Sequence, residues 1–229
     1  MFFYDPTYLL FMVPAFLLMM LTSWYVKSAY NKWSRVPSSS RLTGAQAAQR
    51  LITRGGLYGV QVKGTSGNLS DHYDPRDKTL YLSQSVATGV SVASVAVAAH
   101  ELGHAMQDSE DYLPLRFRAA LVPAVNIGSW LGWILIIVGL FLRMTNLAWL
   151  GVLIFSGGAV FALATLPVEL NASARAKRLL AETGIIQSEQ ERQGVNNVLN
   201  AAALTYVASL VTAVLQLLYF VSLVGGRRR

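Results

Sequence analysis

Four long stretches without a charged residue constrain this chain more than any other feature of its sequence. They cover residues 6–26, 119–142, 144–168 and 194–226. Each stretch can hold the roughly 20 apolar residues that an α-helix needs to cross a bilayer. The composition agrees, because 53% hydrophobic and only 14% charged residues are unusual for a soluble domain. We therefore predict transmembrane helices near residues 7–26, 120–142, 146–167 and 202–223.

Two other features of the sequence bear on the number of transmembrane helices. Residues 79–100 are also uncharged, but they are rich in Ser, Thr, Gln and Gly, so we do not interpret them as a span. The first apolar stretch has no basic segment before it, and Lys27 follows it at once. We expect it to remain as an anchor rather than to be removed as a signal peptide.

The basic residues predict the orientation of the chain. Residues 27–118 contain eleven Lys or Arg and residues 169–200 contain four, whereas the opposite ends of the spans carry only Arg143 and the terminal Arg227, Arg228 and Arg229. By the positive-inside tendency, both polar segments face the cytoplasm. The net charge of +7 is placed beside the apolar stretches, which favours contact with the lipid bilayer and argues against nucleic acid.

The polar part between the first two spans has a mixed α and β pattern. Residues 43–54 predict a helix that is capped by Thr43 and ends at Gly55. Residues 59–63 and 78–83 alternate like short strands, and residues 69–77 between them predict a polar loop. An extended peptide substrate could add to the edge of such a strand, although the sheet could equally serve only to support the following helix.

His100, Glu101 and His104 form the motif H-E-x-x-H. On a helix, positions i and i+4 lie on one face, so both imidazoles can bind one zinc ion. Glu101 would act as general base, because zinc lowers the pKa of its bound water to about 7 and a nearby carboxylate can accept the proton. Three specified residues also occur by chance, and the alternative is a pair of histidines that are simply hydrogen-bonded. The small apolar residues at 91–99 favour a buried helix, and a metal is the usual partner of buried histidines at this spacing.

A third ligand must come from outside the motif. Cysteine is absent, which excludes disulfides, thiolate ligands and cysteine-protease chemistry. Glu110 stands where a metzincin has its third histidine, but it lies in a solvated acidic run. Glu169 is a better candidate, because it is an isolated carboxylate at the end of the third apolar stretch, and the hairpin of two spans returns it to the side of His104. The alternative for Glu169 is an ion pair with Arg175 or Lys177.

These residues carry a family resemblance. The motif at 98–108, the loop at 69–75, the opening residues 3–6 and the segment 168–176 resemble the YugP-type bacterial membrane zinc metallopeptidases along nearly the whole chain. More distantly the chain is similar to the HtpX heat-shock proteases and the CAAX prenyl proteases. The resemblance implies one zinc ion per chain at His100, His104 and Glu169, with Glu101 as base, in a bacterial cytoplasmic membrane.

The chain departs from the HtpX pattern at two positions after the third ligand. Leu170 replaces a Phe, and Ser173 replaces an Asp that orients a histidine ligand. Asn171 and Ser173 are therefore the candidates for the partner of His100. For stabilising the oxyanion we considered His72, in the polar loop, and Arg175. The alternatives are solvent exposure for His72, and an ion pair with Glu169 or a position at the membrane surface for Arg175.

The expected fold is a mainly α, multi-pass membrane protein with four transmembrane helices and a small α+β zincin-like domain that carries the motif. The expected divisions are an anchor helix at 1–26, a metallopeptidase domain at 27–118, a hairpin of two spans at 119–167, a cytoplasmic segment with the third ligand at 168–200, and a last helix with a basic tail at 201–229.

The leading function is a gluzincin-like endopeptidase that cuts polypeptides at the cytoplasmic membrane face, with membrane proteins as one class of candidate substrate. The alternative is a noncatalytic scaffold or regulator stabilised by zinc. A transporter is disfavoured, because no charged residue lies inside the four spans.

Overall fold

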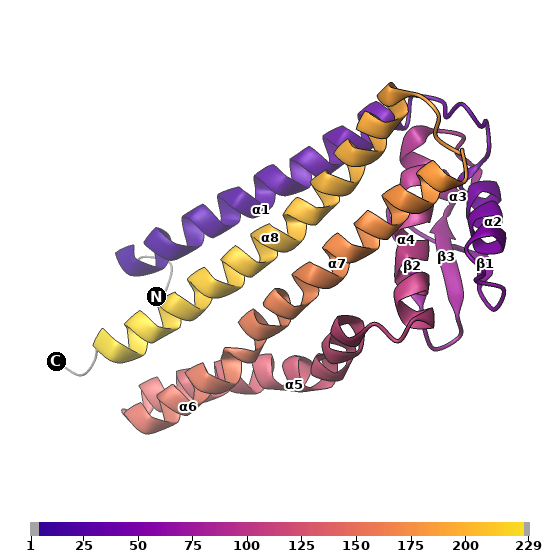
Figure 1. Ribbon diagram of the computed structural model, residues 1–229. Helices are drawn as coiled ribbons and strands as arrows, with labels where there is room; N and C mark the ends of the chain where they lie inside the picture. The colour runs from indigo at the N-terminus through magenta and orange to yellow at the C-terminus, as the bar shows by residue number, and fades with distance from the viewer. Residues whose placement is uncertain (1–4, 227–229) are drawn as a thin grey trace. The chain divides into compact units, whose positions relative to one another are not determined.

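The computed structural model describes residues 5–226 and is mostly helical (Figure 1). Its elements, in chain order, are α1 (Pro6–Trp33), α2 (Gly44–Arg54), β1 (Gln61–Thr65), β2 (His72–Asp74), β3 (Thr79–Ser83), α3 (Gln84–Thr88), α4 (Val92–Ser109), α5 (Leu113–Phe141), α6 (Thr145–Phe155), α7 (Gly157–Glu182) and α8 (Glu189–Gly225). The terminal arginines at 227–229 and residues 3 and 4 of the opening motif lie outside the described residues.

The chain divides into two compact units, each built from separate stretches of sequence. One unit, here called the polar unit, contains Trp24–Leu115 and Val168–Ala203. The other, here called the apolar unit, contains the chain up to Ser23, Arg116–Pro167, and the chain from Leu204 on. Helices α1, α5, α7 and α8 contribute residues to both units.

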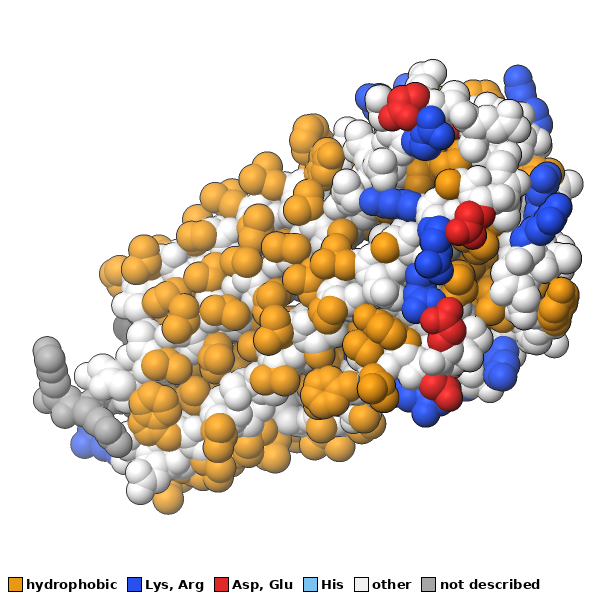
Figure 2. All heavy atoms as spheres, in the orientation of Figure 1, with side chains coloured by type: hydrophobic (Ala, Val, Ile, Leu, Met, Phe, Trp, Pro, Cys, Tyr) orange, Lys and Arg blue, Asp and Glu red, His pale blue; other side chains and the backbone are white. Residues whose placement is uncertain are grey.

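The apolar unit holds most of the residues that were predicted to cross the membrane. Four helical stretches within the described residues are long and apolar enough to do so, namely Pro6–Trp33, Leu113–Phe141, Thr145–Glu182 and Glu189–Gly225. On the face shown in Figure 2, hydrophobic side chains cover much of their surface, and many large hydrophobic residues of these helices are exposed. The unit has its own core, in which Tyr8 packs edge-on against Tyr219 and Phe155 against Phe220. The prediction of four apolar helices is therefore confirmed.

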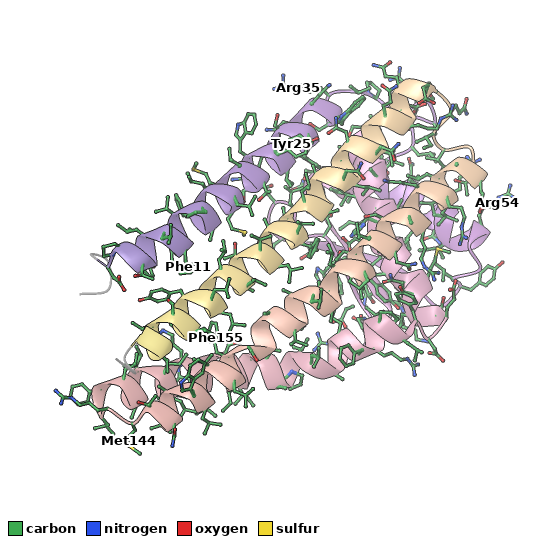
Figure 3. The ribbon with its side chains drawn as sticks, turned by 60° about the vertical axis from the view of Figure 1, so that its left-hand side comes forward. Phe11, Tyr25, Arg35, Arg54, Met144 and Phe155 are labelled. Atoms are coloured by element: carbon green, nitrogen blue, oxygen red, sulfur yellow. The ribbon has the colours of Figure 1, made fainter. Side chains whose placement is uncertain are left out.

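The third predicted span is not one uninterrupted helix. Helix α6 ends at Phe155 and α7 begins at Gly157, with Ser156 between them. The Ser156 hydroxyl donates a hydrogen bond to the carbonyl of Leu153 at 2.6 Å, and the Gly157-Gly158 pair follows directly. Serine and glycine pairs are common causes of helix interruptions. In Figure 3 the labelled Met144 lies in the turn between α5 and α6, and Phe155 marks the end of α6.

The polar unit contains a three-stranded sheet in the order β1-β3-β2. Strand β3 is central, parallel to β1 and antiparallel to β2, with Tyr81 paired to Lys63 on one side and His72 on the other. The two predicted strands are confirmed with bounds shifted by up to two residues. The predicted polar loop at 69–77 is wrong in part, because it contains β2. Asp71 accepts hydrogen bonds from the Ser83 amide and hydroxyl, and these bonds connect residues 69–77 to the end of β3.

Helix α4 carries the metal motif and lies in the interior of the polar unit. Ser91 caps its start by accepting a hydrogen bond from the Ser94 amide at 3.1 Å. Small side chains at 92–99 allow neighbouring elements to pack closely, and nearly all of them are buried. Helix α2 packs against α4 and begins with the predicted cap, in which Thr43 and Gln46 exchange hydrogen bonds. The predicted buried helix and the capped helix are both confirmed.

The segment after α1 is fastened to the starts of α4 and α8. Pro37 forms an isolated antiparallel bridge with Ser91. The buried carboxylate of Glu191, in the first turn of α8, accepts hydrogen bonds from the Ser39 amide at 2.7 Å and the Ser39 hydroxyl at 2.8 Å. It also caps its own helix by accepting from the Ser188 amide at 2.9 Å. This segment therefore positions the start of the motif helix.

Candidate metal centre

Three side chains with metal-binding atoms meet between α4 and α7. His100 and His104 lie one helical turn apart on α4, as the spacing predicts, and Glu169 comes from α7. The Oε2 atom of Glu169 is 3.3 Å from Nε2 of His100 and 3.4 Å from Nε2 of His104. The glutamate side chain is 2% exposed and each histidine 12% exposed. Within the described residues these are the only three His, Asp or Glu side chains grouped closely enough to hold one ion.

The spacing of the three atoms fits a tetrahedral zinc site. Ligand atoms bonded to zinc at about 2.0–2.1 Å and at tetrahedral angles lie about 3.3 Å apart. The two measured nitrogen–oxygen distances of 3.3 and 3.4 Å agree with this value. The donor set of two imidazoles and one carboxylate also suits zinc, and it leaves a fourth position for water or substrate. The residues present therefore fit the ion.

The outer nitrogen of each histidine has a partner of its own. Nδ1 of His100 lies 3.1 Å from the Ser173 hydroxyl, and Nδ1 of His104 lies 3.0 Å from Oε1 of Gln107. These contacts orient both rings with Nε2 toward Glu169, as metal-binding histidines require. Of the two candidates from the sequence for the partner of His100, Ser173 occupies this place, whereas Asn171 contacts Gln107 instead.

Glu101 is partly buried beside the cluster. Burial raises the pKa of its carboxyl, the neighbouring His100 and His104 lower it, and Glu169 raises it again, with a net shift above the ordinary value. Burial lowers the pKa of His104, but the hydrogen bond with Glu169 and the charges of both glutamates outweigh this and raise it. The carboxylates of Glu101 and Glu169 therefore favour the charged form of the His104 ring.

Gly103 permits the close approach of the two helices that carry the ligands. A methyl group added at Gly103 would meet the backbone of Ala172, with its Cα at 3.0 Å and its carbonyl carbon at 2.9 Å. Both distances are shorter than ordinary carbon–carbon contacts of about 3.5–4.0 Å. Ala172 lies three residues after Glu169 on α7, so the motif glycine sets the distance between the histidines and the carboxylate.

Arg175 is held away from Glu169 by other groups. Its Nη1 atom lies 2.7 Å from Oε1 of Glu110, its Nε–H donates to Oδ1 of Asn171 at 2.7 Å, and its guanidinium stacks over Tyr112. The considered Arg175–Glu169 ion pair is therefore not formed, and Glu110 is a partner of Arg175 rather than part of the cluster. The hydrogen bond from Arg175 lowers the pKa of the exposed Glu110 carboxyl below its usual range.

His72 is not brought to the cluster. It lies on β2, exposed, with its ring stacked on Tyr81 and Nδ1 2.9 Å from the Ser70 carbonyl. Neighbouring side chains of a strand point to opposite faces, and the next residue, Tyr73, is the one that reaches α4 by donating to Asp108 at 2.8 Å. His72 therefore points away from the motif helix.

Gln107 is a neighbour of the cluster that the sequence did not identify. It is fully buried and contacts His104. The signal was present in its position three residues after His104, which places both side chains on one face of the helix.

The chain was compared with known proteins. A family model described as "Putative neutral zinc metallopeptidase" matches residues 8–225. The chain is also 44% identical over 203 residues to "Putative membrane protease YugP" of Bacillus subtilis (strain 168), across 88% of this chain and 90% of that protein. No solved structure matches the chain. The resemblance noted from the sequence motifs is thereby confirmed.

Proposed function

We propose that this chain, which belongs to the neutral zinc metallopeptidase family, is a membrane-embedded endopeptidase that uses one zinc ion and cuts polypeptides at the cytoplasmic face of the membrane. The observation that carries the proposal is the convergence of His100, His104 and Glu169, whose ligand atoms all lie within 4.8 Å of one another. A carboxylate placed 65 positions after the motif would not meet both imidazoles in this geometry if the motif had arisen by chance.

His100, His104 and Glu169 would hold the zinc ion, which when bound lowers the pKa of a water molecule to about 7. Glu101 lies beside the cluster without being one of the three ligands. Its carboxylate accepts a proton from the attacking water and then donates it to the amine of the leaving peptide fragment. The raised pKa of Glu101 suits a group that must both take and return a proton near neutral pH.

The sheet limits where an extended peptide substrate can bind. Strand β3 is paired on both sides, so it has no free edge. Strands β1 and β2 are the two edge strands of the sheet within the described residues, and β2 is the edge strand that contacts α4. We propose that the substrate adds to β2 through main-chain hydrogen bonds, whereas the sequence pointed to the predicted strand before the motif helix, which is β3.

The cytoplasmic orientation is supported by the fifteen Lys and Arg residues of segments 27–118 and 169–200. The absence of cysteine makes a direct test simple, since single cysteines can be introduced at Tyr58, which is 80% exposed, and at Arg143. In intact cells a membrane-impermeant maleimide should label the cysteine at position 143 and not the one at position 58. The opposite pattern would place the site outside the cytoplasm.

The catalytic role is tested by Glu101→Gln in the purified full-length protein. The variant should keep about one zinc per chain and lose cleavage of an unfolded polypeptide by at least about 10³-fold, because the proton acceptor is removed while the ligands remain. Glu182→Gln, at an exposed carboxylate of the same unit that pairs only loosely with Arg178, is the matched control and should keep its activity. If Glu101→Gln cleaves like the wild type, Glu101 is not the general base and the mechanism is wrong. If neither form cleaves while zinc only stabilises the fold, the scaffold alternative is correct.

A further inference from the structure

We propose that Gln107 is a positioning residue, held by Asn171 and Arg175, which fixes the proton of His104 on Nδ1 so that Nε2 is the nitrogen that can bind a metal ion beside Glu169. The inference rests on the proposed metal site at His100, His104 and Glu169. It follows from a chain of hydrogen bonds in which every donor and acceptor is determined by the one before.

The chain of hydrogen bonds begins at Arg175, whose guanidinium can only donate. Its Nε–H points at a side-chain atom of Asn171 at 2.7 Å, so that atom must be the carbonyl oxygen Oδ1. The same oxygen lies 2.9 Å from the side-chain amide of Gln107. Two oxygens cannot share this contact, so Gln107 must present its nitrogen, Nε2, to Asn171.

A second anchor fixes Gln107 in the same orientation. Nε2 of Gln107 also donates to the main-chain carbonyl of Val168 at 2.8 Å, and a carbonyl can only accept. The remaining atom of the amide, Oε1, therefore faces Nδ1 of His104 at 3.0 Å. Because Oε1 can only accept, Nδ1 must carry the proton, and the lone pair of the neutral ring lies on Nε2.

That nitrogen is the one that faces Glu169, at 3.4 Å from its Oε2 atom. The proton on Nδ1 of His104 is thus fixed whether or not Nε2 carries one, and Nε2 is the nitrogen left for a metal ion. His100 is different, because its partner Ser173 is a hydroxyl that can either donate or accept at 3.1 Å. The two histidines therefore differ in what fixes their Nδ1 atoms: a hydroxyl that can rotate for His100, and an amide oxygen of fixed orientation for His104.

Arg175 is itself fixed by its surroundings. Glu110 pairs with Nη1 at 2.7 Å, and Tyr112 lies under the guanidinium with 5.7 Å between the ring centroid and the central carbon. These contacts give the arginine, which was considered for the oxyanion, a role away from the reacting atoms. It acts through Asn171 and Gln107 on the histidine.

The proposal predicts which substitutions are tolerated at Asn171. Only its oxygen is used, so Asn171→Asp, which offers acceptors alone, should bind zinc at least as tightly as the wild type. Asn171→Leu removes the acceptor but leaves the Val168 anchor, and should weaken zinc binding by less than about tenfold. Gln107→Leu removes the partner of His104 altogether and should weaken it by about 10–100-fold. Ser109→Ala, on the exposed side of α4, is the control and should change nothing.

Zinc affinity is measured on the purified full-length protein by competition with a chelator, together with the visible spectrum of the Co²⁺-loaded form and the unfolding temperature of the metal-free form. A positioning role predicts an altered Co²⁺ spectrum and weaker binding for Gln107→Leu, and wild-type values for Asn171→Asp. Equal losses of zinc affinity in Asn171→Asp and Asn171→Leu would overturn the orientation assigned to the Asn171 and Gln107 amides. A lower unfolding temperature of metal-free Gln107→Leu with unchanged affinity would show a merely structural role and also overturn it. If the wild type and His104→Ala hold equal zinc, the metal site itself is wrong, which is a separate result.

Discussion

Gly103→Ala tests whether the close approach of α4 and α7 sets the metal site. The added methyl carbon would lie 2.9 and 3.0 Å from two backbone carbons of Ala172, which cannot move aside as a flexible side chain could. Restoring ordinary contacts of about 3.5–4.0 Å requires the helices to separate by about 0.5–1 Å. Metal sites tolerate errors of only about 0.2 Å in ligand distances. The substitution should therefore pull Glu169 out of range of the histidines.

The expected effects on stability and on zinc binding differ in size. Alanine is favoured over glycine within a helix by about 1 kcal/mol, while overpacking costs about 1–3 kcal/mol. The metal-free variant should therefore lose no more than about 2 kcal/mol of unfolding free energy. Zinc affinity should fall at least about tenfold, and cleavage should fall with it.

The assay compares thermal unfolding with and without zinc, and chelator competition, for the wild type, Gly103→Ala and Gly158→Ala. Gly158 is the matched control, because a methyl group there would meet only the Ser129 hydroxyl at 3.7 Å, an ordinary contact. The control should keep its zinc affinity. The reasoning is refuted if Gly103→Ala binds zinc as tightly as the wild type.

Three further predictions concern single contacts of the polar unit. Glu191→Gln should lower the unfolding free energy by about 2–3 kcal/mol in a thermal or denaturant assay, because the carboxylate accepts hydrogen bonds from Ser39 and Ser188. The control Glu189→Gln, at an exposed position of the same helix, should have little effect. Tyr73→Phe should cost about 1–2 kcal/mol at pH 8. Burial and the hydrogen bond to Asp108 raise the pKa of Tyr73, so the fold favours the neutral phenol. The difference in unfolding free energy between Tyr73→Phe and the wild type should therefore shrink as the pH rises above the ordinary pKa of 10.0. A difference that stays constant with pH would contradict this. Ser173→Ala should weaken zinc binding by about tenfold in chelator competition, and unchanged affinity would show that His100 needs no partner.

The sequence predicted the parts of the protein that depend on local pattern. Charge-free stretches identify membrane helices because the bilayer excludes charge, and the i, i+4 spacing of His100 and His104 follows from helix geometry alone. The break at Ser156 and strand β2 escaped prediction, since both are short and depend on a few hydrogen bonds. Strand β2 in particular exists because of its pairing with β3, which lies in the same sheet but later in the chain.

The partners of the metal ligands were harder to assign for the same reason. Spacing along the sequence does not show which side chain of α7 faces which histidine ring. Ser173 and Asn171 were both candidates for His100, and only the three-dimensional arrangement separates them. Gln107 carried a signal in its spacing from His104, but a polar residue in a helix is more often exposed than buried.

The contacts on α7 explain why the third ligand requires this helix and not merely a nearby glutamate. Glu169, Ala172 and Ser173 follow the i, i+3, i+4 pattern of one helix face, and they meet the histidines and the motif glycine. Val168, Asn171 and Arg175 form the adjacent stripe, which meets Gln107 and Glu110. Both stripes belong to one rigid helix, so a shift of α7 by one residue would rotate it by about 100° and remove all of these contacts together. The metal ligand, the orienting groups and the close packing therefore form a single structural unit, and none of them can be kept while the register of α7 against α4 is changed.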